Sequence, residues 1–537
     1  MNLRNCLLLF FAFTISFQLS AQERYLDELF TDVTVTSNVV YGVNATILLI
    51  SDPNVGEAIP QPLIMNVYEP TGDTETERPL VIYLHTGNFL PQPAFCSIGG
   101  QLIDDVLVEI STRLAKRGYV VATIDYRLGW NPVASTQSER TLTLINAAYR
   151  GVQDIRTCIR YFKKDVVEGT NQFGVDTSRI TVWGQGTGGY ASLAAATIDQ
   201  YEDIVLPKFT FDFMGIPVPM VIPAVNGDIY GTSVGIVPAG TPPPFTVGDT
   251  LCYPNHVGYN SDFQLCVNMG GALGDISWLD ASDPPMISFH VPNDSLAPYT
   301  EGILIVPTTG DLVVEVQGSY VIQQEVKALG NNAVFAGQDW NDEYTAAANL
   351  VNDGADGLFP FVYPVFPDPT NPPNGVITVS APWEWWDQAA YTDVYCLLNQ
   401  DFDLNTIGLA GNPLMSETQG MAYVDSIMGY FLPRACLALD LGCDISAFVS
   451  TQEVLTAAQV NLEMRPNPAT QEVYLESGQD SPMLDVMVYD LSGRLLQSHM
   501  NQHTNEFILD RNNLPTGMYL VKIRFEKGMI TQKLIYK

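Results

Sequence analysis

Apolar runs alternate with amphipathic stretches along most of this chain. Residues 79–85 form an apolar run typical of a buried strand, and residues 102–117 repeat apolar side chains at helical spacing up to Gly118, a common helix stop. Residues 119–124 form the next apolar run. This order of strand, helix and strand predicts an α/β fold with a mostly parallel sheet and helices on both faces.

The same alternation continues further along the chain. A second helix is predicted over residues 150–164, and further strands over residues 179–183, 263–268 and 285–290. Residues 207–249 are instead rich in Pro and Gly and have no clear period, which predicts an insertion of about residues 207–260 over the C-terminal edge of the sheet. A lid or pocket wall would lie there, and residues 353–373 read as another loop.

The pattern changes after about Val449. Residues 461–537 contain short alternating runs, no long helical pattern and turn signals at Asn467-Pro468, Ser492-Gly493 and Thr516-Gly517. We therefore expect a small all-β sandwich over residues 461–537, joined by a linker over residues 449–460 to an α/β domain over residues 22–448.

The N-terminus has the features of a signal peptide. Arg4 precedes an apolar run over residues 6–17, and Leu19-Ser20-Ala21 stands before Gln22 as a cleavage site. The apolar run is too short to span a bilayer comfortably, and no later apolar run is long enough for a membrane helix. Residues 1–21 are therefore predicted to direct export.

The charge of the chain limits its partners. With 59 Asp and Glu against 25 Lys and Arg, the formal net charge is -34. Such a field repels polyanions, so nucleic acids and anionic membranes are poor partners, and we attribute the acidity to the solubility of an exported protein.

No metal or cofactor is expected. Residues 401–405 begin like a calcium loop, but Thr406 and Asn412 stand where that loop needs glycine and glutamate. No Cys or His spacing is typical of zinc.

Of eight cysteines, Cys6 lies in the predicted signal peptide, which leaves seven and therefore at least one free thiol. The closest spacings are Cys252 with Cys266 and Cys436 with Cys443, and these are the first disulfides expected in an exported chain. Cys158 lies in a predicted helix and is expected to be a buried apolar residue.

Four segments of the C-terminal region carry a specific resemblance: residues 465–470, 488–494, 514–522 and 533–534. In this order they resemble the type A C-terminal sorting domain of the type IX secretion system of Bacteroidota. The resemblance implies that the outer-membrane secretion machinery is a partner, and that the protein is secreted or held at the cell surface. A carbohydrate-binding or adhesive β-module is the alternative.

Residues 66–294 resemble a bacterial carboxylesterase of the α/β-hydrolase superfamily. The resemblance rests on residues 66–70, on His85-Thr86-Gly87-Asn88 in place of a His-Gly-Gly-Gly type loop, on residues 125–129, and on the elbow Gly184-Gln185-Gly186-Thr187-Gly188. It implies an α/β-hydrolase fold with a Ser, acid and His triad.

The expected triad is incomplete. The elbow normally carries serine at its centre, but Gly186 stands there and has no side chain to attack a carbonyl. The resemblance places the acid at Asp294, and the base should be a histidine that follows it. The histidines of the domain all precede Asp294: His85, His256 and His290. We expect no ordinary esterase turnover, and buried structural roles for His85 and His290.

Other groups near the elbow remain candidates. Thr187 with His256 as its base is a rescue pair with little support, since the residue after the nucleophile normally serves through its backbone N–H. The backbone N–H groups of Gly87, Asn88 and Thr187, with Asp294 opposite, would hold a carbonyl or carboxylate without reacting with it. The tryptophans of residues 382–387 would either stack on a sugar or polymer ring or, as we favour, anchor a loop by packing.

Three functions follow from these observations. The leading hypothesis is a non-catalytic carboxylesterase homologue that binds a small molecule, glycan, polymer or protein partner. The alternatives are an active hydrolase of esters or polymers that uses non-standard groups, and an adhesive or structural surface protein.

Overall fold

The structure, a computed structural model, describes residues 22–241, 245–305, 310, 312–368, 375–397, 400–449, 453–491, 495–500 and 502–537. The predicted signal peptide and the predicted turn at Ser492-Gly493 lie outside the described residues. No helix in the described ranges has the length and apolar character to cross a membrane.

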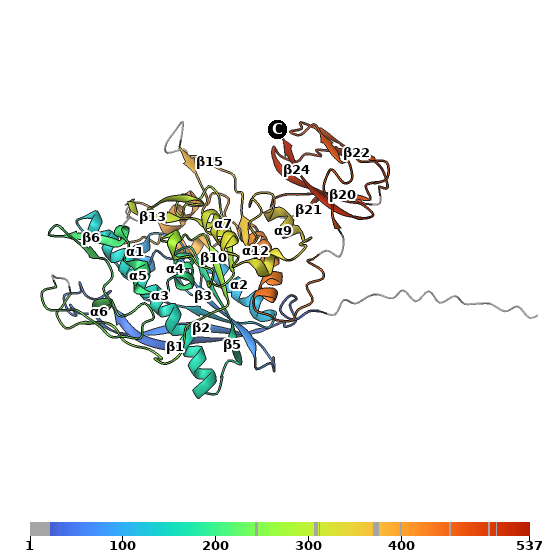
Figure 1. Cartoon of the computed structure of the whole chain (residues 1–537). Helices are drawn as coiled ribbons and strands as arrows, with labels where there is room; N and C mark the ends of the chain where they lie inside the picture. Colours follow the sequence, from blue (N-terminus) through green and yellow to red (C-terminus); the bar gives the residue numbers. More distant parts are fainter. Residues whose placement is uncertain are drawn as a thin grey trace, which may run out of the picture.

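An eight-stranded sheet forms the centre of the larger part of the molecule, which we call the α/β unit (Figure 1). In spatial order its strands are β1 (Val33–Thr46), β2 (Ile59–Pro70), β4 (Val120–Ile124), β3 (Arg78–Leu84), β5 (Val175–Gln185), β10 (Leu265–Met269), β11 (Met286–His290) and β14 (Leu358–Pro360). The pairs β1–β2 and β2–β4 are antiparallel, and the other pairs are parallel. The predicted mostly parallel sheet is confirmed.

Helices cover both faces of this sheet. On β3, Leu80 and Ile82 point into one core with α3 (Gln137–Glu168) and α4 (Thr187–Thr197), whereas Val81 and Tyr83 point into a second core. That second core contains α2 (Asp105–Lys116) and α12 (Glu417–Ala438). Because alternate side chains of a strand face opposite sides, a strand that is apolar throughout is buried on both faces.

Two predicted boundaries were wrong. The helix expected over residues 150–164 begins at Gln137, because Thr136 caps it by accepting a hydrogen bond from Glu139 N at 3.2 Å. The loop expected over residues 353–373 contains β14, a short strand that is defined by its pairing with β11 and not by its own sequence.

The predicted insertion forms small elements beside the sheet. It contains the hairpin of β6 (Thr210–Phe213) and β7 (Ile216–Pro219), the helices η1 (Pro207–Phe209) and α6 (Pro223–Asn226), and the pair β8 (Gly235–Ile236) and β9 (Thr250–Cys252). A further hairpin, β12 (Glu301–Ile305) with β13 (Leu312–Gln317), follows β11. The remaining elements of the unit are α1 (Gln92–Phe95), α5 (Tyr201–Ile204), η2 (Ile276–Trp278), α7 (Ser319–Leu329), α8 (Ala333–Ala336), α9 (Glu343–Ala348), β15 (Phe366–Pro367), β16 (Val376–Ile377), α10 (Gln388–Tyr391) and α11 (Leu404–Gly411).

The C-terminal β unit contains two sheets that enclose their own core. Its strands are β17 (Glu453–Val454), β18 (Glu463–Arg465), β19 (Glu472–Glu476), β20 (Asp485–Tyr489), β21 (Leu495–His499), β22 (Glu506–Asp510), β23 (Gly517–Arg524) and β24 (Gly528–Tyr536). The β unit, red in Figure 1, contacts the α/β unit through Leu520, which joins that unit's second core, and through Lys522 Nζ, which donates to Asn341 O at 2.9 Å. The predicted β-rich C-terminal region is confirmed.

One predicted disulfide is confirmed and one was wrong. Cys436 pairs with Cys443, and Cys96 pairs with Cys396 across 300 residues of sequence. Cys252 and Cys266 are free buried thiols, because Cys266 lies in β10 inside the main sheet while Cys252 packs beside Asn44 of β1. Cys158 is also free and buried, as expected.

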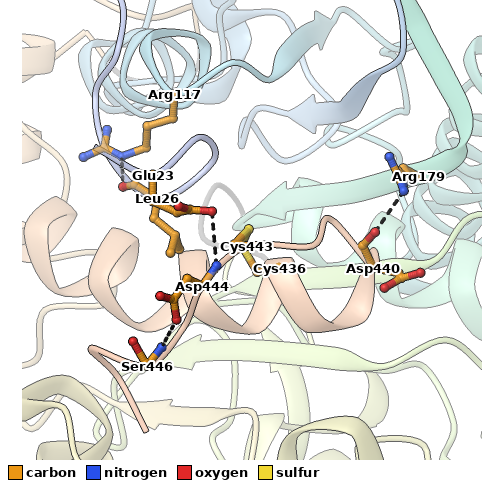
Figure 2. Close-up of a disulfide and its surroundings, with 9 residues drawn as sticks. All are labelled: Glu23, Leu26, Arg117, Arg179, Cys436, Asp440, Cys443, Asp444 and Ser446. Carbon is orange, nitrogen blue, oxygen red and sulfur yellow. Dashed lines mark hydrogen bonds between the residues drawn. A yellow bond between two sulfur atoms is a disulfide. The ribbon is translucent and has the colours of Figure 1, made fainter. Parts of the chain in front are cut away.

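The Cys436–Cys443 disulfide closes the turn that follows α12 (Figure 2). Within this turn Asp440 O accepts a hydrogen bond from Arg179 Nη2 at 2.9 Å. Directly after it, Asp444 N donates to Glu23 Oε1 at 3.1 Å. The last helix of the α/β unit is thereby fixed both to β5 and to the first described residues of the chain.

Candidate functional site

The elbow between β5 and α4 keeps the backbone of a nucleophile turn. Gly186 has φ 52° and ψ -116°, a left-handed conformation that side chains rarely adopt. The flanking glycines are required by close approach: a Cβ on Gly184 would overlap Gly188 O, and a Cβ on Gly188 would lie 2.6 Å from Leu84 O. The glycine pattern therefore preserves the turn even though the central residue carries no side chain.

Thr86 occupies the space above Gly186. A Cβ built on Gly186 would overlap Thr86 Oγ1 and lie 2.9 Å from Thr86 Cβ. The loop after β3 thus fills the volume in which a side chain at position 186 would begin. The elbow therefore carries no side chain at position 186, and the side chain of Thr86 from the neighbouring loop occupies that space.

Asp294 lies at this site, as expected, and a serine hydroxyl contacts one of its carboxyl oxygens. Asp294 Oδ1 accepts hydrogen bonds from Leu296 N at 2.7 Å, from Ala297 N at 3.1 Å and from Ser380 Oγ. Ser380 belongs to the segment that precedes the tryptophan cluster. A serine hydroxyl has no accessible basic form, so Ser380 cannot act as the missing base.

His290 is buried in an internal hydrogen-bond network. Its Nδ1 lies 2.7 Å from Ser319 Oγ, its Nε2 lies 3.1 Å from Ala297 O, and Nε2 is 3.6 Å from Asp294 Oδ2. A carbonyl only accepts, so the proton is on Nε2 and Nδ1 accepts from Ser319. Burial lowers the pKa of His290, which favours this neutral form.

His85 also has structural contacts. His85 is buried, stacks on Tyr126 with ring centroids 4.6 Å apart, and has Nε2 3.6 Å from Asp125 Oδ1. Its pKa is raised: burial opposes the shift, and the hydrogen bond and charge of Asp125 outweigh it. The expected structural roles of His85 and His290 agree with these contacts.

The structure does not bring the rescue pair together. His256 Nε2 donates to Tyr41 O at 2.7 Å, and its ring packs against Tyr161. Thr187 Oγ1 instead accepts from Asn88 N at 2.8 Å. The expectation that His256 is free to serve as a base for Thr187 was therefore wrong.

The expected oxyanion-type donors are only partly available. The N–H of Asn88 is used by the Thr187 hydroxyl, so it cannot serve a ligand in this arrangement. The backbone of Gly87 is in tight contact with Gly100, since a Cβ built on Gly87 would lie 3.0 Å from Gly100 Cα. Thr187 begins α4 directly after Gly186, and its backbone N–H has no hydrogen-bond partner among those that the described residues provide.

Glu384 is a titratable residue of the site that the sequence did not single out. Its Oε1 accepts from Gln185 Nε2 at 2.6 Å, and Gln185 Oε1 accepts from Tyr83 OH at 3.1 Å. Burial, aided by the charge of Asp104, raises the pKa of Glu384 to about 8. The side chain is therefore mostly protonated at neutral pH and has an O–H to donate.

These groups line one end of a cavity of about 250 Å³. Its polar end includes Gly186, Thr187, Asp294, Ser380 and Glu384. Most of the rest of the lining is apolar, and much of it comes from α3, α4 and the predicted insertion, which supplies Phe209, Val221 and Ile229. The expected pocket wall is thus confirmed.

The tryptophan cluster is packed, as we favoured. Trp383 is 1% exposed and Trp386 is 7% exposed, while Trp385 packs over Gly420 of α12. The rejected calcium loop has a simple local role, because Asp403 caps α11 through Thr406 N at 2.7 Å.

Sequence reasoning missed Thr86, Ser380 and Glu384 as parts of the site. A signal existed for Thr86, because it replaces a glycine of the expected loop next to His85. Ser380 and Glu384 reach the elbow from a segment almost 200 residues away, and no local pattern marks them.

The sheet order, the helices on both faces and the strand-to-helix elbow define an α/β-hydrolase fold. Residues 65–212 match the BD-FAE family model, and residues 463–537 match the model of the secretion system C-terminal sorting domain. The chain therefore combines an esterase-like α/β-hydrolase domain with a type IX sorting domain, which acts with the secretion machinery and directs export to the cell surface or the medium.

Solved esterase structures show a weak likeness. Esterase 2 of the planctomycete Thermogutta terrifontis with bound propionate has 15% identity and a TM-score of 0.25, covering 49% of this chain and 74% of that chain. A truncated carbohydrate esterase from gut microbiota has 16% identity and a TM-score of 0.26, covering 50% of this chain and 79% of that chain. At these scores the activities of those enzymes carry no weight for this chain.

Proposed function

We propose that this protein is an exported, non-catalytic esterase homologue that binds a ligand in the cavity of the former active site. One observation carries the proposal: Gly186 has no side chain that could act as a nucleophile, and Thr86 fills the space in which such a side chain would begin. The surroundings of Asp294 support it independently: Ser380 contacts Oδ1, and the nearby imidazole of His290 directs its Nε2 proton to Ala297 O.

The proposed organisation of the chain follows the sequence pattern. We assign residues 1–21 to the signal peptide, residues 22–448 to the hydrolase-like domain with its insertion at about 207–260, residues 449–460 to a linker and residues 461–537 to the sorting domain. The linker is attached to the sorting domain, because β17 pairs with β24 and Leu455 lies in the core of the β unit.

The test is labelling of the purified protein with a fluorophosphonate probe, together with hydrolysis of short acyl esters. We expect no covalent adduct and only background hydrolysis, because a reactive serine needs an adjacent base. Stoichiometric labelling, with saturable hydrolysis that the label abolishes, would overturn the proposal.

An active hydrolase has one specific observation in its favour. Ser319, His290 and Asp294 form a Ser, His and Asp series, with Ser319 Oγ 2.7 Å from Nδ1 and Asp294 Oδ2 3.6 Å from Nε2. However, Ser319 is fully buried and is not among the residues that line the cavity, and the Nε2 proton points to Ala297 O. We therefore favour a structural network.

Ser319→Ala separates the two functions. If the network is structural, wild type and Ser319→Ala give the same background hydrolysis and neither is labelled, while the variant loses stability through the unpaired His290 Nδ1. Labelling that disappears in Ser319→Ala would identify a working hydrolase.

A further inference from the structure

The shape of the cavity limits what it can hold. Its lining follows α4 from Thr187 to Ile198, a length of about 16 Å at the rise of a helix. An engineered cavity of about 150 Å³ binds benzene, so a cavity of about 250 Å³ exceeds a single ring. A modest volume drawn out over this length suits a linear chain.

The chemistry of the lining is divided along this length. Away from the elbow, at what we call the tail end, α4 contributes Ala191, Ala194 and Ile198 to the lining, and α3 contributes Leu144, Ala148 and Val152. Small and aliphatic side chains at helical spacing line a smooth apolar wall. The polar side chains named above lie at the elbow end, so the cavity is amphipathic from one end to the other.

The polar end has donors that no protein group uses. The Tyr190 hydroxyl and Trp383 Nε1 are buried and lack a hydrogen-bond partner among the described residues, and both residues line the cavity. A buried polar group without a partner costs free energy, so an acceptor oxygen from a ligand would be stabilising here.

The polar end disfavours an anionic head group. None of the described residues that line the cavity is Lys, Arg or His, whereas Asp294 and Glu384 both line it. Because Glu384 is mostly protonated at neutral pH, Asp294 is the acidic group that a carboxylate or phosphate would meet without a compensating cation, which is a costly arrangement in a buried site. An uncharged head with acceptor oxygens avoids this cost.

The cavity opens at an apolar rim. Leu296 and Ile305 line the cavity and are nevertheless 44% and 39% exposed to solvent. Ile303 and Leu312, on the same β12–β13 hairpin as Ile305, are also exposed. An aliphatic chain would pass apolar side chains on its way in.

We infer that the cavity binds an intact, uncharged single-chain amphiphile, with its aliphatic tail between α3 and α4 and its oxygen-bearing head at the elbow; a monoacylglycerol has this chemistry. The inference rests on the proposed function, since an active esterase would cleave such a molecule.

The test is calorimetric titration of the full chain with 1-decanoylglycerol below its aggregation concentration, compared with decanoate and with glycerol. We expect saturable 1:1 binding of decanoylglycerol, at least roughly tenfold weaker binding of decanoate, and no binding of glycerol. Equal affinity for decanoate, tighter binding of an aromatic ester such as ethyl cinnamate, or no binding of decanoylglycerol would overturn the inference.

Variants locate the ligand. Ala194→Phe on α4 and Ala148→Phe on α3 fill the tail end from two sides and should each weaken binding at least roughly tenfold, while Tyr190→Phe removes a head donor and should weaken it by a few fold. Val167→Ala, an exposed position outside the lining of the cavity, is the matched control and should bind as wild type. Thermal melts of each variant identify any that fail to fold, and full affinity in both folded Phe variants would refute the location.

The same titration distinguishes the two proposals. If decanoate is released from decanoylglycerol at a rate above background, the non-catalytic assignment fails while the ligand class stands. If nothing binds and nothing is released, the ligand class fails and the non-catalytic assignment stands.

Discussion

Thr86 and Gly186 share one small space where two neighbouring strands of the sheet end. The backbone at Gly186 has the positive φ of a nucleophile turn, so the proposed loss of function would come from the missing side chain and not from a change of fold. A serine introduced at position 186 would place two side chains in the volume of one.

We predict that Gly186→Ser destabilises the protein by about 2–4 kcal/mol, from overpacking against Thr86 and from strain at positive φ. The double variant Thr86→Gly/Gly186→Ser should recover the overpacking part. Gly72→Ser is the matched control, since Gly72 also has positive φ but has no atom within 4 Å of its Cβ position. This variant should lose only the stability that corresponds to backbone strain. Urea unfolding measures all three, and equal stability of the single and double variants would contradict the shared space.

Glu384 should make stability depend on pH. Its pKa is raised from 4.5 to about 8, so between these values the folded state binds more protons than the unfolded state. Stability from this group is therefore fully present below about pH 4.5 and is lost as pH rises through about 8.

We predict that Glu384→Gln, which keeps the acceptor for Gln185, flattens the fall in melting temperature between pH 5 and 8. Some slope should remain, because burial also raises the pKa of Asp283 to about 7. Glu417→Gln, at an exposed position, should leave the profile of wild type unchanged. An unaltered profile in Glu384→Gln would show that the carboxyl is already ionised at neutral pH.

At the scale of elements, α12 depends on glycines for its packing. A Cβ on Gly429 would lie 2.6 Å from Tyr344 Cζ, which belongs to α9, so the helix and the ring are in direct contact. Gly411, at the end of α11, has nothing within 4 Å of its Cβ position.

We predict opposite effects of alanine at these two glycines. Alanine is favoured over glycine in helices by up to about 1 kcal/mol, so Gly411→Ala should be neutral or stabilising, whereas Gly429→Ala should destabilise by about 1–3 kcal/mol through overpacking. Chemical denaturation measures both. A stabilised Gly429→Ala would mean that Tyr344 can move away without cost.

The sequence predicted the elements whose signal is local. The strands β3 and β4, with α2 between them, were found because each is apolar at its own period. The features that it missed depend on partners far away in sequence: β14 is defined by β11, and Cys96 by Cys396.

The same distinction applies to the site. The vacant nucleophile position at Gly186 could be read directly, because the elbow is a contiguous motif. The roles of Ser380 and Glu384 could not, because the folding of a late segment onto the elbow brings them there. The hydrogen bond from His256 to Tyr41 O could not be read from the sequence either, because the two residues are 215 positions apart.

At the scale of the whole molecule, two disulfides constrain the chain very differently. Cys96–Cys396 closes a loop of 300 residues and links the segment before α2 to the segment between α10 and α11, whereas Cys436–Cys443 spans only seven. In the chain-entropy description, stabilisation grows with the logarithm of loop length, to about 5–6 kcal/mol for the long loop and about 2–3 kcal/mol for the short one.

We predict that Cys96→Ala/Cys396→Ala destabilises the protein more than Cys436→Ala/Cys443→Ala does. Guanidinium unfolding of the two double variants under oxidising conditions measures the difference. If the short disulfide proves the more costly one to remove, its role is the local attachment of α12 to Glu23 and Arg179, and chain entropy is not the main term.

The two units of the molecule have separate cores and meet in one contact region. Leu520 of the β unit joins the second core of the α/β unit, Tyr489 and Leu491 pack against that core, and Lys522 Nζ donates to Asn341 O. We expect this contact region to support the position of the sorting domain without being needed for the fold of its neighbour.

We therefore predict that deletion of residues 461–537 leaves the α/β unit folded and traps it in the periplasm, with a melting temperature only a few degrees lower because the surface beneath Leu520 becomes exposed. Cell fractionation and a thermal melt measure the two effects. Lys522→Ala in the full chain is the matched control: it should lose the contact to Asn341 and still be exported. If the truncated chain reaches the cell surface, export does not depend on the C-terminal unit, and if it cannot fold, the two units form one cooperative structure.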